Sequence, residues 1–190
     1  MRARFLTVSA ILALMPTVAV AASPEAWKLV GDAAHIMVRD TVVTYDGKPS
    51  GRLMSFRKTD GTGTMMQDIA PDDYIGKRIR FSGYVRARGV KDWAGLWMRV
   101  DSQINPRGCG EMLAFDNMED RPIKGTSDWT RYDVVLDVAK EAKGIAFGIL
   151  LKGEGTVWLS GATFEVVGME VASTNTWGRE SKPANPNFDH

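Results

Sequence analysis

The stretch DWAGLWMRVD (92–101) places two tryptophans within five residues, beside an arginine and an aspartate. In a strand, alternate side chains point to opposite faces. Trp97, Arg99 and Asp101 then share one face, and the residues between them form an aliphatic face suited to a core. An indole beside charged groups can stack on the apolar side of a sugar ring while those groups bind its hydroxyls. The alternative is that Trp97 is buried packing and Arg99–Asp101 is a structural ion pair.

A second polar and aromatic face is predicted in RIRFSGYVRAR (78–88). The alternation is regular, with Ile79 and Phe81 on the face predicted to be buried, and it indicates a half-buried strand. Tyr84 and Arg86 lie on the opposite face. We expect Arg86 to donate hydrogen bonds to the same ligand as Arg99, with Tyr84 beside it.

The segment LAFDNMEDRPIKGTSDW (113–129) is rich in acidic, basic and amide side chains. Its strand pattern ends near Asp116 and Asn117, where a long loop begins. Residues at such strand ends often line clefts, so Asp116, Asn117 and Arg121 are candidate ligand-binding residues. Gln67, in the short strand predicted at 63–69, is the remaining candidate and would fix the orientation of the ligand. The alternative for this mixed-charge loop is solvated surface.

Catalytic motifs are scarce in this chain. His35 lies in a weakly patterned strand, His190 ends the sequence, and neither a Gly-x-Ser-x-Gly nor a His-Glu-x-x-His motif is present. Two histidines and the single Cys109 offer no transition-metal ligand set, and we read Cys109 as a free thiol. We therefore expect no catalytic residue, no metal and no cofactor. A glycoside hydrolase remains a third hypothesis, because Asp116 and its acidic neighbours Glu119 and Asp120 could pair across a cleft.

Short strand patterns recur along the chain with Gly, Asp and Pro between them, which is typical of an antiparallel sandwich or barrel. The clearest further strands are 132–138, 144–151 and 156–167, the last bending near Ser160-Gly161. We predict an all-β fold with one β-sandwich domain at 23–168. Residues 169–190 are polar and aperiodic, and we predict a mobile tail.

The first 22 residues read as a signal peptide. Two arginines precede an apolar run that ends in small residues at a cleavage pattern. We therefore expect a periplasmic or secreted protein with no membrane span after cleavage. A membrane anchor is the rival reading, but the apolar run is shorter than a bilayer span. The formal net charge of +1 argues against nucleic acid as a partner, and one cysteine allows no internal disulfide.

Three strings carry a family resemblance: GTMMQDIAPDDYIGKRIRFSGYVRARGVKDWAGLWMRVD, LAFDNMEDRPIKGTSDWTRYDVVLDV and GIAFGILLKGEGTVWLSGATFEVV. Between about Trp27 and Val167 the chain resembles a galactose-binding-like β-sandwich domain of carbohydrate-binding-module type. Such domains are found appended to some bacterial transcriptional regulators and S41-type peptidases. The resemblance implies an antiparallel two-sheet jelly roll and a ligand-binding or accessory role. Related sandwiches often hold a structural Ca²⁺ near the last strand, where this chain has Ser160-Gly161 in place of acidic residues, so we do not expect that ion.

These observations favour an exported, non-catalytic module that binds a carbohydrate, a cell-envelope glycan or another small polyhydroxylated ligand. The alternative is a protein-interaction or accessory subunit that binds an envelope protein. A groove with an exposed tryptophan would favour the first, and a flat apolar patch the second.

Overall fold

The computed structural model describes residues 26–102 and 111–178, and nearly all regular structure there is antiparallel strand. The predicted all-β class is confirmed. The predicted signal peptide, Cys109 and the end of the predicted tail lie outside the described residues. The strands are β1 (Lys28–Gly31), β2 (His35–Tyr45), β3 (Lys48–Ser55), β4 (Thr62–Ile69), β5 (Arg78–Asp101), β6 (Met112–Asp116), β7 (Ile123–Asp137), β8 (Gly144–Lys152) and β9 (Thr156–Val167); one 3₁₀ turn, η1 (Asp72–Tyr74), precedes β5.

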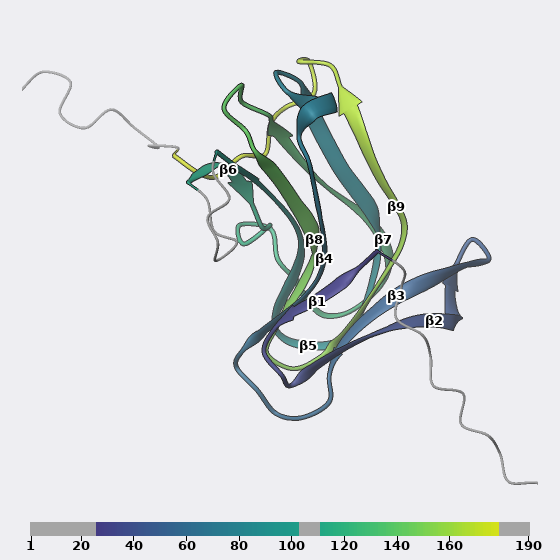
Figure 1. Ribbon diagram of the computed structural model, residues 1–190. Coiled ribbons are helices and arrows are strands. Elements are labelled where there is room, and N and C mark those ends of the chain that lie inside the picture. The colour runs from purple at the N-terminus through teal and green to yellow at the C-terminus, as the bar shows by residue number, and fades with distance from the viewer. Residues whose placement is uncertain (1–25, 103–110, 179–190) are drawn as a thin grey trace, which may run out of the picture.

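The strands form one continuous sheet that curls until its two halves face each other (Figure 1). One half, here called the first sheet, has the order β1-β4-β8-β5-β6. The other half, the second sheet, has the order β2-β3-β9-β5-β7. The 24-residue β5 belongs to both, because its start pairs with β7 and β9 and its end pairs with β8 and β6. The fold is therefore a two-layer β-sandwich in which one strand crosses between the layers.

The crossing in β5 lies near Gly89, where the alternation of the strand is interrupted. Ala87 and Val90 are both buried although three positions separate them. Gly89 adopts a left-handed φ of 60°, which glycine reaches without a Cβ penalty, and the register with β7 shifts there. Side chains that point outward before Gly89 and after it therefore lie on opposite outer faces of the sandwich.

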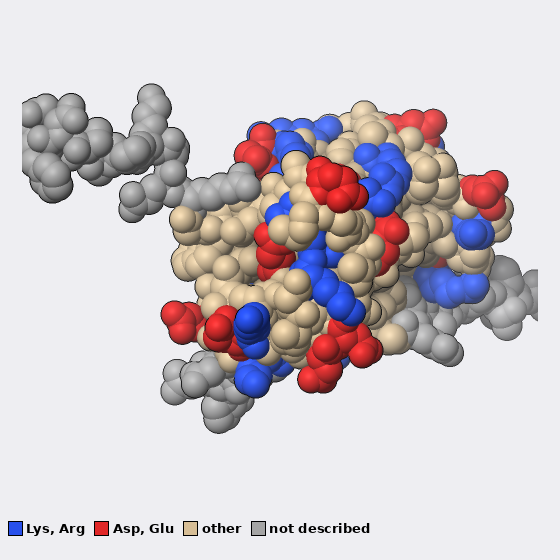
Figure 2. Space-filling view, turned by 90° about the horizontal axis from the view of Figure 1, so that it is seen from above, with Lys and Arg blue, Asp and Glu red and all other residues tan. Residues whose placement is uncertain are grey.

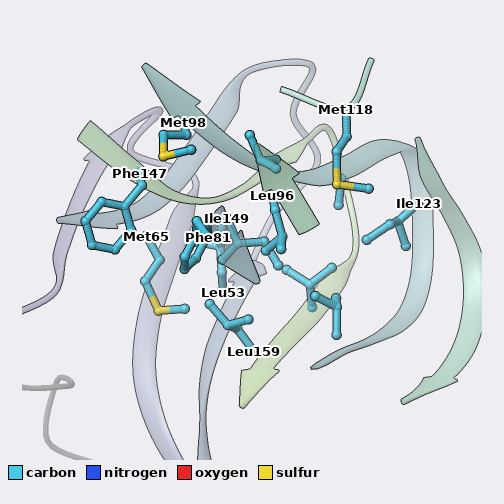
Figure 3. Packing of buried hydrophobic residues seen from close by; sticks show 14 of the residues in the cluster. Leu53, Met65, Phe81, Leu96, Met98, Met118, Ile123, Phe147, Ile149 and Leu159 are labelled. Atoms are coloured by element: carbon cyan, nitrogen blue, oxygen red, sulfur yellow. The ribbon is translucent and has the colours of Figure 1, made fainter. Parts of the chain in front are cut away.

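The core fills the space between the two sheets (Figure 3). Leu96, Phe147 and Ile149 of the first sheet meet Phe81 and Leu159 of the second, and every one of these side chains is at most 6% exposed. Burying each such side chain contributes about 1.5–3 kcal/mol. The aliphatic face predicted in 92–101 is part of this core.

The segment after β9 packs along one open edge of the sandwich, although we predicted a mobile tail from residue 169. Arg78 donates hydrogen bonds to the carbonyls of Met169 and Val171. The amide of Thr174 donates to the Val135 carbonyl on β7, and the amide of Thr176 donates to the carbonyl of residue 115 on β6. Residues 168–178 thus join the edge strands of the two sheets.

Charged side chains of both signs are interspersed at the end of the sandwich seen in Figure 2. Several are ion-paired across neighbouring strands. Arg78 contacts Asp137 at 2.7 Å and Arg80 contacts Glu165 at 2.8 Å. This mixed surface agrees with the near-neutral net charge of the chain.

Candidate functional site

Trp97 lies on the outer face of the first sheet with its indole held against the strands. It pairs with Gly148 of β8, and its Nε1 donates a 2.7 Å hydrogen bond to Thr64 Oγ1 on β4, the next strand outward. The indole therefore crosses β8 at a position that has no side chain. Thr64 itself donates to the Ile149 carbonyl, so its position is fixed. The ring is partly exposed, and its polar edge is already satisfied within the protein.

A cleft of about 430 Å³ opens on the same face; Arg99 lines it, whereas Trp97, two residues before Arg99 on β5, is not one of its lining residues. Register places Ala146 opposite Arg99, two pairs along from Trp97 and Gly148 and therefore on the same face. The floor is small and apolar, and the walls carry charged groups of both signs. The lining side chains on this face are Met66, Asp68, Arg99, Asp101, Lys143 and Ala146.

Arg99 and Asp101 form an ion pair inside the cleft. Arg99 Nε donates to Asp101 Oδ2 at 2.9 Å, and Asp101 is only 6% exposed. The other carboxylate oxygen, Oδ1, is buried and has no hydrogen-bond partner among the described residues. A buried acceptor with no donor costs free energy, and because this oxygen is not accessible from the surface, the ligand-facing polar groups of the cleft are those of Arg99, Asp68 and Lys143. Of the predicted residues, Trp97, Arg99 and Asp101 are the three that the fold brings together.

Gln67 does not join this group. It pairs with Phe147 of β8 and has the same parity along β4 as Met65, which is 1% exposed. Its side chain therefore points to the inner side of the first sheet, away from Trp97. The pattern of the short strand at 63–69 does not indicate which of its side chains point inward, because its two methionines are adjacent and suit either face.

Tyr84 and Arg86 lie on the outer face of the second sheet. Both precede the crossing at Gly89, whereas Trp97 follows it, so the two groups are on opposite sides of the sandwich. The prediction that Arg86 and Arg99 serve one ligand is therefore wrong for this fold. Arg86 instead approaches Asp128 at 3.8 Å, and both side chains are largely exposed.

Tyr84 belongs to an aromatic cluster that the sequence reasoning missed. Tyr45 stacks on Tyr84 with ring centroids 4.0 Å apart, and Trp129 lies 5.5 Å from Tyr45. The hydrogen bond with Tyr84 raises the pKa of Tyr45 to about 12. The signal for Tyr45 was Asp46-Gly47, a dipeptide typical of a two-residue hairpin, which here joins β2 to β3.

A second tryptophan, Trp158, also lies on the outer face of the second sheet, but it is only 3% exposed. Its Nε1 donates to Asp40 Oδ2 at 2.9 Å, and the Arg88 guanidinium stacks over its ring at 5.2 Å. Burial opposes ionisation of Asp40. Backbone hydrogen bonds from Val43 and Val42 and the indole hydrogen bond outweigh that effect and hold the pKa of Asp40 below its usual value.

Asp116 and Arg121 form a structural pair rather than part of a cleft. Asp116 pairs with Met98 in register, points inward and is fully buried. Arg121 contacts both of its oxygens and also Asp120. Burial opposes the charge on Arg121, but the hydrogen bond and charge of Asp116 raise the pKa of the guanidinium. Asn117 caps the adjacent turn by accepting from the amide of residue 119.

The hydrolase hypothesis gains no support from these carboxylates. Arg121 forms ion pairs with both Asp116 and Asp120. This arrangement is typical of a structural ion-pair cluster rather than of two carboxylates that flank a glycosidic bond. Within residues 26–102 and 111–178, no group of three or more His, Cys, Asp or Glu side chains is placed to hold a metal ion. In the same ranges, no helix has the length and hydropathy to cross a bilayer.

Several solved structures with a similar fold are carbohydrate-binding modules, and another is the enzymatically active domain of bacteriophage CBA120 tailspike protein 4, with a TM-score of 0.51 and 13% identity over 75% of this chain and 20% of that chain. The CBM22-2 xylan-binding domain of Paenibacillus barcinonensis Xyn10C aligns with a TM-score of 0.55 and 8% identity, covering 75% of this chain and 92% of that one. The CBM22-1–GH10 modules of Clostridium thermocellum Xyn10B, complexed with xylohexaose, align with a TM-score of 0.54 and 12% identity over 74% of this chain and 26% of that chain. A family 16 carbohydrate-binding module aligns at 0.52 and 11% identity, covering 73% and 89%. The fold is a carbohydrate-binding-module-type β-sandwich, as the sequence resemblance implied.

In sequence, the chain is 44% identical over 133 residues to the Bacillus subtilis (strain 168) protein described as the uncharacterized HTH-type transcriptional regulator YbfP. The match covers 69% of this chain and 43% of that protein, so the chain spans less than half the length of this relative. No family model matches the chain.

Proposed function

We propose that the protein is a non-catalytic carbohydrate-binding module whose site is the outer face of the first sheet. The observation that carries the proposal is the position of Trp97, whose partly exposed indole lies across β8, two residues along β5 from Arg99, which lines the 430 Å³ cleft. The fold shared with xylan-binding domains supports the same ligand class.

The chemistry of this face suits a neutral sugar. An aromatic face offers apolar contact to the C–H side of a pyranose ring, while polar groups at its edge bind hydroxyls. The carboxylate of Asp68 supplies an acceptor at the cleft, and Arg99 and Lys143 supply donors. Because Arg99 is already oriented by Asp101, little side-chain entropy is lost when a hydroxyl binds.

The test is isothermal titration of the chain with neutral oligosaccharides, including xylohexaose and soluble envelope glycans. Trp97→Ala is expected to lower the affinity about tenfold, since an aromatic contact of about 1.4 kcal/mol is lost. Trp177→Ala is the matched control, because Trp177 is 49% exposed and lies on the segment after β9. Failure of every neutral glycan to bind, or equal losses in both variants, would refute the proposal.

The accessory-subunit alternative has one observation in its favour. The edge strand β1 is exposed along its length, and Leu29 and Val30 are 40% and 49% exposed. An unpaired edge with apolar side chains can receive a strand from a partner. Recovery of one stoichiometric envelope protein by the wild-type chain but not by Val30→Lys, together with no glycan binding, would favour this function.

Export is also part of the proposal. The arginine-flanked apolar run and small-residue cleavage pattern of residues 1–22 support a periplasmic or secreted location. Fractionation of cells expressing the full chain tests it: the processed protein is expected outside the cytoplasm, and an unprocessed cytoplasmic chain would contradict it.

A further inference from the structure

The outer face of the second sheet carries a small cleft on the side of the sandwich opposite Trp97. Its volume is about 130 Å³, and it lies between Val43 of β2 and Thr126 of β7, with Trp158 and the arginines 86 and 88 along it. The Thr126 hydroxyl accepts a hydrogen bond from the Gly89 amide, which fixes that wall. The volume suits one small group rather than an extended chain.

Two guanidinium groups line this cleft with little to neutralise them. Arg86 and Arg88 are two positions apart on β5 and therefore project on the same side, roughly 7 Å apart. Arg86 is 3.8 Å from Asp128, but their side chains are 47% and 86% exposed, so water screens the pair. No ion pair of Arg88 is present among the described residues, and its partner there is the ring of Trp158.

The stacking of Arg88 on Trp158 prepares the guanidinium for a ligand. Trp158 is locked by Asp40, and the planar guanidinium above it keeps its N–H edges available. An ordered guanidinium at the surface can bind a carboxylate, sulfate or phosphate with two parallel hydrogen bonds. By contrast, Arg52 on the same face is already paired with Asp40 at 3.3 Å.

Next to this cationic cleft lies the aromatic cluster of Tyr45, Tyr84 and Trp129. Tyr84 has the same outward parity on β5 as Arg86 and is partly exposed. Gly161 lies beneath the stacked tyrosines, where a Cβ would come within 3.4 Å of Tyr84. A ring contact and an anion contact are thus available side by side, which is the combination that an acidic sugar presents.

We infer that the outer face of the second sheet is a separate site for an acidic saccharide. Arg86 and Arg88 bind its anionic group and the Tyr45–Tyr84–Trp129 cluster contacts its ring. This site goes beyond the proposed function, because it uses none of the residues around Trp97 and requires negative charge on the ligand.

The experiment is titration with a tetrasaccharide of galacturonic acid and with the same saccharide after reduction of its carboxyls to alcohols. The acidic form is expected to bind and the reduced form to bind at least tenfold more weakly. Raising the salt concentration is expected to weaken binding of the acidic form. Equal binding of the two forms would overturn the inference.

The variants are Arg86→Gln and Arg88→Gln, each expected to weaken binding about tenfold through loss of a charge-assisted contact. Arg88→Lys is expected to recover only part of the affinity, because an ammonium cannot form the two-point contact. Arg80→Gln is the matched control: it removes the same charge from the same strand and face, but Arg80 is paired with Glu165. A similar loss in the control would mean that only net charge matters and would overturn the site.

Two further titrations test whether a free inorganic anion is the ligand and whether the acidic and the neutral saccharide bind at different sites. Inorganic phosphate and sulfate are titrated alone, and binding of either as tight as that of the tetrasaccharide would refute the saccharide part of the inference. Saturating xylohexaose is expected to leave the affinity for the acidic saccharide unchanged, and competition would show a shared site. If no neutral glycan binds, the proposed function fails, while the arginine variants still decide this inference.

Discussion

Each outer face of the sandwich carries a tryptophan whose indole N–H is bonded within the protein, yet the two rings are in opposite situations. Trp97 donates to the neutral hydroxyl of Thr64 and stays partly exposed on the face that carries the larger cleft. Trp158 donates to the carboxylate of Asp40, lies under Arg88 and is 3% exposed. The residue type and the anchoring bond are the same. What covers the ring differs: Trp158 supports an arginine, whereas Trp97 stays open to the ligand that we propose for this face.

The largest expected effect is on stability. Trp158→Ala removes a buried ring and is expected to lower the free energy of unfolding by about 3–5 kcal/mol. Trp97→Ala removes a partly exposed ring and is expected to cost about 1–2 kcal/mol. Urea unfolding followed by circular dichroism measures both. Equal costs would show that Trp97 is a packing residue, and the comparison between the two faces would fail.

A smaller effect concerns pH and the carboxylate that holds Trp158. Asp40 has a lowered pKa in the fold, so its charge stabilises the protein above about pH 3.8, and that contribution is lost as pH falls through the folded pKa. Asp40→Asn is expected to cost about 1–2 kcal/mol at pH 7. At pH 3 or below, the difference from wild type should shrink. Urea unfolding at pH 7 and pH 3 tests this, and an undiminished difference would contradict it.

The smallest expected effect on stability is that of Thr64→Val on the outer face of the first sheet. The change keeps the shape of the side chain but removes the acceptor for Trp97, at an expected cost of about 1 kcal/mol. Because the indole loses its fixed position, the affinity for a neutral glycan should fall several-fold while binding of the acidic saccharide is unchanged. Titration with both ligands measures this, and an unaltered glycan affinity would show that the hydrogen bond does not position the ring.

Strand alternation predicted most of the fold, because nearly every strand buries one side. The patterns at 78–88 and 92–101 were assigned correctly to inner and outer faces. These two patterns did not predict that both segments lie in one strand, β5, which passes from one sheet to the other at Gly89. A glycine between two strand patterns indicates a turn as readily as a bulge, and only pairing with β8 and β9 separates the two outer faces.

The candidate site residues were predictable where their arrangement depends on one strand, and not where it depends on how different strands pair with one another. Trp97, Arg99 and Asp101 were grouped correctly by parity. Asp116 was wrongly assigned to a cleft because the end of a strand does not indicate which face a side chain is on. Its inward direction follows from its pairing with Met98 and from its ion pair with Arg121. The aromatic cluster joins three strands distant in sequence, so no local pattern could have shown it.

Nuclear magnetic resonance of the indole N–H groups addresses the assignment of Trp97 as the glycan-binding residue. Each indole signal is identified from a single tryptophan variant, and the wild-type chain is then titrated with xylohexaose. The Trp97 signal is expected to shift progressively, while the signal of the covered Trp158 stays in place. A shift confined to Trp158 or Trp129, with Trp97 unmoved, would contradict the assignment of the glycan site to the first sheet.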